Sequence, residues 1–233
     1  MRDSLPTVLI PGLANTARLY AHQIPALWRY GPVTIADHTR DDSMSGIARR
    51  ILATAPPRFA LVGLSMGGYT AFEIMRQAPE RVERLALLDT TARPDAPEQT
   101  ERRKAQIALA RSGRLSEVVE QLFPLFVHSS RTDDEALKAL VLEMAEEAGA
   151  EAFSRQQTAI MTRPDSRPNL PDIACPTLVL VGDGDRLTPP DRAEEMASLV
   201  SGSRLVVVPT CGHLSALEQP RVVTDALDDW LRI

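Results

Sequence analysis

The stretch from Phe59 to Gly68 constrains the fold of this 233-residue chain more than any other part. A short apolar run ends in Gly63-Leu64-Ser65-Met66-Gly67, and a helical pattern follows at once. A buried strand must therefore stop, turn sharply at Ser65 and continue as a helix. The flanking glycines permit this, because without Cβ atoms they let the strand and the helix pack closely around a tight turn. The turn exposes the Ser65 hydroxyl at the end of the strand.

Apolar runs and helical patterns alternate before and after the middle of the chain. Strand and helix in alternation at this spacing predict a parallel sheet with right-handed crossovers. Helices are expected at 17–30, with a kink or break at Pro25, at 44–55 and 66–78, from about Pro190, and from Pro220 through Trp230. The predicted strands lie at 7–10, 33–36, 59–63, 84–88, 177–181 and 205–208.

The strand pattern is interrupted between Thr90 and Ala174. A helical insertion between two strands would cover one edge of the sheet as a lid or cap. The sequence therefore predicts a core domain of residues 1–90 and 175–233 and a helical cap of residues 91–174. The segment from Arg163 to Pro168 is predicted to be an extended return to the sheet. Amphipathic helices are expected at 97–112, 115–128, 133–148 and 150–161.

Composition limits the choice of partner and compartment. The 26 Lys and Arg and 31 Asp and Glu residues give a formal net charge of −5, which argues against nucleic acid or an anionic membrane. We expect a soluble cytoplasmic protein, since the sequence has neither a signal-peptide pattern nor an apolar run of membrane-spanning length. Cys175 and Cys211 lie at opposite ends of neighbouring predicted strands, so free thiols are expected.

A serine nucleophile needs a base within hydrogen-bond reach, and four histidines are available. His213 follows the last predicted strand, and loops at the carboxyl ends of parallel strands share one side of the sheet with Ser65. His38 also follows a strand and is the rival base. His22 falls within a predicted helix and His128 within the insertion, which disfavours both.

The base in turn needs an orienting acid, and three aspartates qualify by position. Asp183 and Asp185 follow the fifth predicted strand, and Asp89 follows the fourth. Asp183, between two glycines, is also a natural turn residue, and Asp89 could serve as a structural hydrogen-bonding group. Asp185 is favoured and Asp89 is the runner-up, and the order Ser65, Asp185, His213 is the one described for a serine on a strand-to-helix turn.

The remaining site predictions concern the oxyanion and the substrate. Backbone N–H groups must stabilise the oxyanion, and those of Met66, at a helix N-terminus, and Leu13, after the first strand, are the expected donors. Arg163 and Arg167 could meet a substrate carboxylate beneath the cap, although solvated or structural ion-paired positions also account for them. No paired metal-ligand spacing or phosphate-binding glycine loop occurs in the sequence, so neither metal nor cofactor is expected.

Together these motifs resemble the α/β-hydrolase superfamily over essentially the whole chain. Within it, the chain looks most like small-cap bacterial serine hydrolases similar to acyl-carrier methyl esterases and enol-lactonases. The resemblance implies a mostly parallel six-stranded sheet flanked by helices, a helical cap, a catalytic triad and the aspartate four residues before a proline as its acid. The motifs that carry it are Gly12-Leu13, Gly63-Leu64-Ser65-Met66-Gly67-Gly68, Gly182-x-x-Asp185-x-x-x-Pro189 and Gly212-His213.

The predicted function is hydrolysis of a small carboxylic ester, thioester or lactone through an acyl-enzyme on Ser65. The same site could instead carry out C–C bond hydrolysis, perhydrolysis or a lyase step, because fold and triad do not fix the reaction. A non-catalytic binding module is a third possibility, disfavoured because nucleophile, base and acid are all present. The expected partner is a small acyl substrate.

Overall fold

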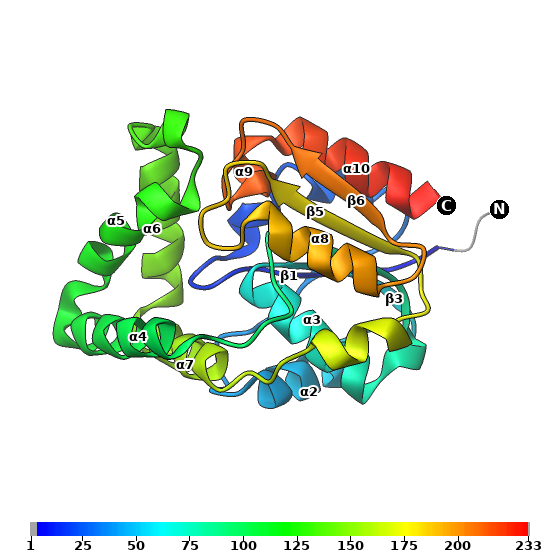
Figure 1. Ribbon diagram of the computed structural model, residues 1–233, viewed down its shortest axis with the longest axis horizontal. Coiled ribbons are helices and arrows are strands. Elements are labelled where there is room, and N and C mark those ends of the chain that lie inside the picture. Colours follow the sequence, from blue (N-terminus) through cyan, green and yellow to red (C-terminus); the bar gives the residue numbers. More distant parts are fainter. Residues whose placement is uncertain (1–3, 233) are drawn as a thin grey trace.

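The computed structural model describes residues 4–232 (Figure 1). The strands are β1 (Thr7–Ile10), β2 (Val33–Ile35), β3 (Phe59–Leu64), β4 (Val82–Leu88), β5 (Thr177–Gly182) and β6 (Arg204–Val208). They form one sheet in the order β2-β1-β3-β4-β5-β6, and every neighbouring pair is parallel. The predicted six-stranded α/β architecture is confirmed.

Helices cover both faces of the sheet, because successive side chains of a strand point to opposite faces. Val62 and Leu180 share one apolar core with α1 and α10. Leu61 and Val181 share the other with α2, α3 and α8. These helices are α1 (Ile24–Leu27), α2 (Met44–Thr54), α3 (Met66–Gln77), α8 (Pro190–Leu199) and α10 (Pro220–Arg232).

The helical stretch predicted at 17–30, with a kink or break at Pro25, is broken into two short helices. The structure has a 3-10 helix at Ala17–Tyr20 and then the four-residue helix α1. Pro25 lies in the first turn of α1, where its missing N–H group is tolerated. In the interior of a longer helix the proline ring would clash with the preceding turn, so one continuous helix cannot pass through this position.

The helices between β4 and β5 match the stretches predicted to be helical. They are α4 (Pro97–Leu109), α5 (Leu115–Phe126), α6 (Glu135–Ala148) and α7 (Ala150–Met161). Helix α5 packs on α6, and α4 packs on α7. In Figure 1 the four helices stand together on the left, the side toward which the arrowheads of β5 and β6 point. They therefore lie beyond the carboxyl ends of the strands.

Two other segments between the strands differ from the prediction. The extended return predicted from Arg163 to Pro168 is only partly correct, because a 3-10 helix begins at Arg167 and runs to Asp172. A short helix, α9 (Ser215–Glu218), follows β6 and was not predicted.

The two cysteines are not paired with each other. Cys175 and Cys211 are free thiols, as expected, and Cys211 is buried. Within residues 4–232, no helix is both long enough and apolar enough to span a bilayer.

Candidate active site

Ser65 occupies the sharp turn that joins β3 to α3. Its backbone has φ 54° and ψ −113°, a conformation that residues with a Cβ atom rarely adopt. Residues at the end of β4 bind both backbone groups of Ser65, whose carbonyl also accepts from the Gly68 N–H group at 2.9 Å in the first turn of α3. The Ser65 N–H group donates to the Leu88 carbonyl at 2.9 Å, and the Thr90 hydroxyl donates to the Ser65 carbonyl at 2.8 Å. The end of β4 thus stabilises the strained turn that follows β3.

The glycines on either side of Ser65 are required by close backbone contacts. A Cβ atom on Gly67 would lie 2.0 Å from the Ile10 carbonyl oxygen. One on Gly63 would lie 2.3 Å from the Gly67 carbonyl oxygen. Neither distance leaves room for a side chain, so β1, β3 and α3 can approach this closely only with glycine at both positions.

His213 connects Ser65 to Asp185 through two short hydrogen bonds. Its Nε2 atom lies 2.8 Å from Ser65 Oγ, and its Nδ1 atom lies 2.8 Å from Asp185 Oδ2. The Thr188 hydroxyl donates to Asp185 Oδ2 at 2.7 Å. The backbone N–H groups of Leu187 and Thr188 donate to Asp185 Oδ1, each at 2.9 Å. The carboxylate is therefore fixed by its own loop.

The pKa values of this pair follow from burial and from mutual attraction. Burial opposes protonation of His213, but the Asp185 carboxylate outweighs it and raises the pKa of His213 above its usual value. Burial likewise opposes ionisation of Asp185. The charge of His213 and the hydrogen bonds from His213 and Thr188 outweigh it, so the pKa of Asp185 is lowered. The pair thus favours an ionised aspartate beside an imidazole that readily accepts a proton.

The rival acid, Asp89, is buried nearby and is engaged with the backbone. Its carboxylate accepts hydrogen bonds from the N–H groups of Gly182 at 3.1 Å and Ser215 at 3.2 Å. Burial and the charge of Asp185 raise the pKa of Asp89 well above its usual value. Asp89 therefore links the loop that carries Asp185 to the loop that carries His213.

The rival base, His38, lies in a different environment. It is buried, and its Nε2 atom lies 2.9 Å from the Gly12 carbonyl oxygen. Burial lowers the pKa of His38. The remaining candidates also have other surroundings, since His22 is exposed and His128 Nδ1 lies 2.7 Å from Ser130 Oγ.

The loop after β1 lies beside the Ser65 turn, because Ile10 is paired with Gly63 in the sheet. The loop turns back on itself through a 3.1 Å hydrogen bond from the Asn15 N–H group to the Gly12 carbonyl. Helix α7 supports it, since Gln156 Oε1 accepts from the Ala14 N–H group at 2.9 Å. The predicted oxyanion donors thus lie beyond the ends of the neighbouring strands β1 and β3, Leu13 in the loop after β1 and Met66 at the first position of α3.

Glu218 is a supporting residue that the sequence did not indicate. Its carboxylate accepts hydrogen bonds from the N–H groups of Gly212 at 2.9 Å and His128 at 2.7 Å. The Phe126 carbonyl accepts from the N–H groups of both His213 and Leu214 at 3.0 Å. The end of α5 is therefore bound to the His213 loop. No local pattern announces this contact, because His128 and Glu218 are 90 residues apart.

A cavity of about 690 Å³ lies over Ser65 and His213. Its floor includes Gly12, Leu13 and the Ser65 turn, and its walls include side chains of α4 and α5. Apolar groups such as Leu122 lie beside glutamine and arginine side chains in this wall. The space is large enough for a small organic substrate.

The two arginines predicted to contact a substrate are separated in the structure. Arg163 lines the cavity, but its Nη1 atom lies 2.6 Å from Asp95 Oδ1 and its guanidinium stacks over the Tyr69 ring, 4.2 Å from the centroid. Arg167 pairs with Asp165 at 2.6 Å and is not among the described residues that line the cavity. Only Arg163 therefore lies where a substrate could reach it.

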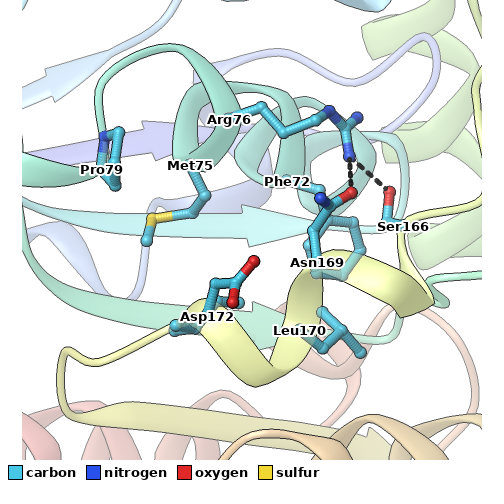
Figure 2. A pocket seen from close by; sticks show the side chains of 9 residues that line it. Phe72, Met75, Arg76, Pro79, Ser166, Asn169, Leu170 and Asp172 are labelled. Atoms are coloured by element: carbon cyan, nitrogen blue, oxygen red, sulfur yellow. Dashed lines mark hydrogen bonds between the residues drawn. The ribbon is translucent and has the colours of Figure 1, made fainter.

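A second, smaller cavity of about 240 Å³ lies between α3 and the 3-10 helix at 167–172. Figure 2 shows Arg76 reaching across it, and its Nη1 atom donates to Ser166 Oγ at 3.1 Å and Asn169 Oδ1 at 3.4 Å. The side chains that line it do not include a paired nucleophile and base. Across residues 4–232, no group of three or more His, Cys, Asp or Glu side chains is arranged to hold a metal ion.

The sequence profile of the alpha/beta hydrolase family matches residues 5–226. The chain belongs to this family. The hydrolase is 32% identical to a malate-bound thermophilic esterase from Thermogutta terrifontis, with a TM-score of 0.89 over 98% of this chain and 89% of that one. It is 27% identical to the pimeloyl-[acyl-carrier protein] methyl ester esterase of Nitrosomonas europaea over 80% of this chain and 77% of the relative.

The fold is shared with more distant hydrolases as well. The enol-lactonase from Burkholderia xenovorans LB400 superposes with a TM-score of 0.87 at 23% identity, covering 99% of this chain and 92% of that one. The predicted superfamily, the predicted fold class and the prediction that the chain is an enzyme are confirmed.

Proposed function

We propose that this hydrolase cleaves a small carboxylic ester, thioester or lactone through an acyl-enzyme formed on Ser65. The observation that supports the proposal is the unbroken hydrogen-bond chain from Ser65 Oγ through the His213 imidazole to Asp185, with 2.8 Å at each link. A nucleophile, a base and an orienting acid in this geometry are what acyl transfer to a serine requires.

The proposed mechanism assigns one task to each group. Ser65 Oγ attacks the substrate carbonyl carbon while His213 Nε2 accepts the hydroxyl proton. Asp185 holds the imidazole and stabilises its charged form. The N–H groups of Leu13 and Met66 donate to the oxyanion. His213 then protonates the leaving alkoxide or thiolate and afterwards activates the water that releases the acid.

The insertion has a proposed role in substrate choice. We assign residues 1–90 and 175–233 to the core domain and residues 91–174 to a cap. Side chains of α4 and α5 line the cavity over Ser65, so the cap would determine which small acyl substrate fits. The name of the Thermogutta terrifontis relative, an esterase, supports ester hydrolysis as the first reaction to assay. The cytoplasmic location stays a prediction from the sequence.

The test compares two serine variants with 4-nitrophenyl acetate and butyrate as substrates. We expect Ser65→Ala to lose about 10⁶-fold in kcat, the loss typical of a triad nucleophile. Ser198→Ala, which changes an exposed serine on α8, should retain wild-type turnover. Undiminished turnover by Ser65→Ala would overturn the mechanism.

A fluorophosphonate probe separates a live nucleophile from a binding module. The wild-type chain and Ser198→Ala should be labelled, and Ser65→Ala should not. If the wild-type chain resists labelling and cleaves neither ester, the chain is a binding module and the proposed function is wrong.

A further inference from the structure

The cavity over Ser65 is lined by an unusual concentration of positive charge. No Asp or Glu lines it among residues 4–232. The whole chain has a formal net charge of −5, so the cavity is opposite in sign to the molecule around it. We call its arginines the arginine wall, and they are Arg93, Arg102, Arg103, Arg163, Arg186 and Arg192.

The inner part of the arginine wall is only half neutralised. Arg103 and Arg163 share a single carboxylate, Asp95, and each lies 2.6 Å from one of its oxygens. The Asp95 side chain is 1% exposed, and that of Arg163 is 5% exposed. One buried guanidinium group and one that is 20% exposed therefore share a single negative charge.

The outer part carries two arginines without an acidic partner. Arg93 pairs with Glu195 at 2.8 Å, and Arg192 pairs with Asp191 at 3.1 Å. Arg102 and Arg186 form no ion pair with a carboxylate of residues 4–232, and both are exposed. Three carboxylates thus pair with four of the six arginines, and Glu195 also pairs with Arg167 at 3.6 Å, which leaves a surplus of positive charge on the cavity wall.

A surplus of positive charge raises the electrostatic free energy of the cavity unless an anionic ligand neutralises it. Like charges in a cleft repel one another, and the low-dielectric walls strengthen their common field. A guanidinium group stays charged at every physiological pH, and its planar fork matches a carboxylate through two parallel hydrogen bonds. A neutral ester would gain nothing from the arginine wall, whereas an anionic one would supply the missing charge.

We propose that the cavity takes an ester or lactone that carries a second group, a free carboxylate, and that the arginine wall binds this carboxylate. The inference rests on the proposed esterase function and narrows its substrate class to half-esters of dicarboxylic acids and similar compounds. Arg102 on α4 and Arg186, directly after Asp185, are the primary contacts, because neither has a carboxylate of its own. The anion would then lie between the insertion and the Asp185 loop.

The experiment compares esters that differ only in charge. Methyl hydrogen adipate and methyl hexanoate have the same chain and the same ester, and methanol release reports kcat/KM for both. We expect the adipate half-ester to be preferred by about tenfold or more, as for a hydrogen bond between charged groups. The preference should shrink as salt rises from about 20 mM to about 0.5 M, because salt screens exposed charges.

Matched variants locate the effect. Arg102→Gln and Arg186→Gln should reduce the ratio of kcat/KM values, adipate half-ester over hexanoate, by about fivefold to tenfold each. Arg221→Gln, which removes an exposed arginine on α10, should leave the ratio at its wild-type value. A ratio that both cavity variants leave unchanged would contradict the proposal.

A binding measurement separates this inference from the esterase proposal. Calorimetry with Ser65→Ala should show methyl hydrogen adipate binding more tightly than methyl hexanoate at low salt, with Arg102→Gln weakening it. Equal rates and equal binding for the two esters would overturn the inference and leave the esterase function standing. Preferential binding of the half-ester without any cleavage by the wild-type chain would overturn the esterase function instead.

Discussion

The Thr90 hydroxyl donates a 2.8 Å hydrogen bond to the carbonyl oxygen of Ser65. Ser65 has a positive φ of 54°, and its carbonyl also accepts from the Gly68 N–H group at 2.9 Å, so the Thr90 bond is one of the restraints on this strained turn. Thr90 is buried, directly after Asp89, in the loop that leaves β4. One loop therefore orients both the turn that carries Ser65 and, through Asp89, the loops that carry Asp185 and His213.

Replacing Thr90 by valine removes this bond without changing the shape of the side chain. We expect Thr90→Val to lower the free energy of unfolding by about 1 kcal/mol and kcat by about tenfold, because Ser65 would lose its fixed position. Thr224→Val is the control, since the Thr224 hydroxyl donates to the Pro220 carbonyl at 2.6 Å within α10. It should lower stability similarly and leave kcat intact. A wild-type kcat in Thr90→Val would contradict the restraining role.

Gly67 tests the close approach of α3 to β1. In Gly67→Ala the new methyl group would meet the Ile10 carbonyl oxygen at 2.0 Å, so the helix must shift. We expect a loss of at least about 1–3 kcal/mol in stability and about 100-fold in kcat. Gly113→Ala meets no atom within 4 Å but has φ 85°, so it should cost about 1–2 kcal/mol and leave kcat unchanged. Thermal unfolding and ester assays measure both effects.

The raised pKa of His213 leads to a prediction for the pH dependence of the proposed reaction. The mechanism needs His213 as a neutral base, so kcat/KM should rise with pH and reach half its maximum above pH 6.5. Asp185→Asn removes the carboxylate that stabilises the imidazolium form. Its half-maximal point should therefore move to lower pH, while kcat falls by about 10⁴-fold. A pH–rate profile with 4-nitrophenyl acetate would show both, and an unmoved profile would contradict the assignment.

The variant Asp89→Asn distinguishes the structural role proposed for Asp89 from the orienting role proposed for Asp185. An asparagine offers one carbonyl oxygen where Asp89 accepts hydrogen bonds from both Gly182 and Ser215, so about 1–3 kcal/mol of stability should be lost. We expect kcat to stay at least about 100-fold above that of Asp185→Asn. Equal losses of kcat in the two variants would instead indicate Asp89 as the orienting acid.

Asp95 should matter for stability because it is buried between two arginines. Removing one partner of a buried ion pair leaves an uncompensated charge, so Asp95→Ala should cost about 3–5 kcal/mol of unfolding free energy. Glu101→Ala removes an exposed partner of Lys104 and should change stability by less than about 1 kcal/mol. Urea unfolding compares the two variants. A small effect of Asp95→Ala would mean that the arginines find solvent or another acceptor.

The strands and the loops that carry Ser65, Asp185 and His213 could be predicted because their signals are local. An apolar run, a glycine pair and a polar residue at a strand end are all contained in about ten residues. A parallel sheet then places the ends of such strands on one side, so the topology alone brings these loops together. The interruption near Pro25 could be predicted for the same reason, because a proline inside a helical pattern kinks or ends the helix.

The supports of the site could not be predicted, because they join distant segments. Arg163 and Asp95 are 68 residues apart, and their contact depends on how the insertion folds. Glu218 looks like any surface acid in sequence, yet it is buried against backbone N–H groups from two loops. Pairing of this kind follows from tertiary packing rather than from periodicity.

The contact between Phe126 and the His213 loop limits which part of the insertion can be exchanged without disturbing the site. The Phe126 carbonyl oxygen accepts hydrogen bonds from the N–H groups of His213 and Leu214. Two residues after Phe126, the His128 N–H group donates to the Glu218 carboxylate. The end of α5 therefore supports the loop that carries His213, although it belongs to the insertion in chain order. A chimera that replaces only residues 97–122 keeps both Phe126 and His128 and therefore keeps these contacts. A chimera that replaces residues 91–174 changes one partner of each contact. New specificities should therefore be sought by swapping the outer helices alone.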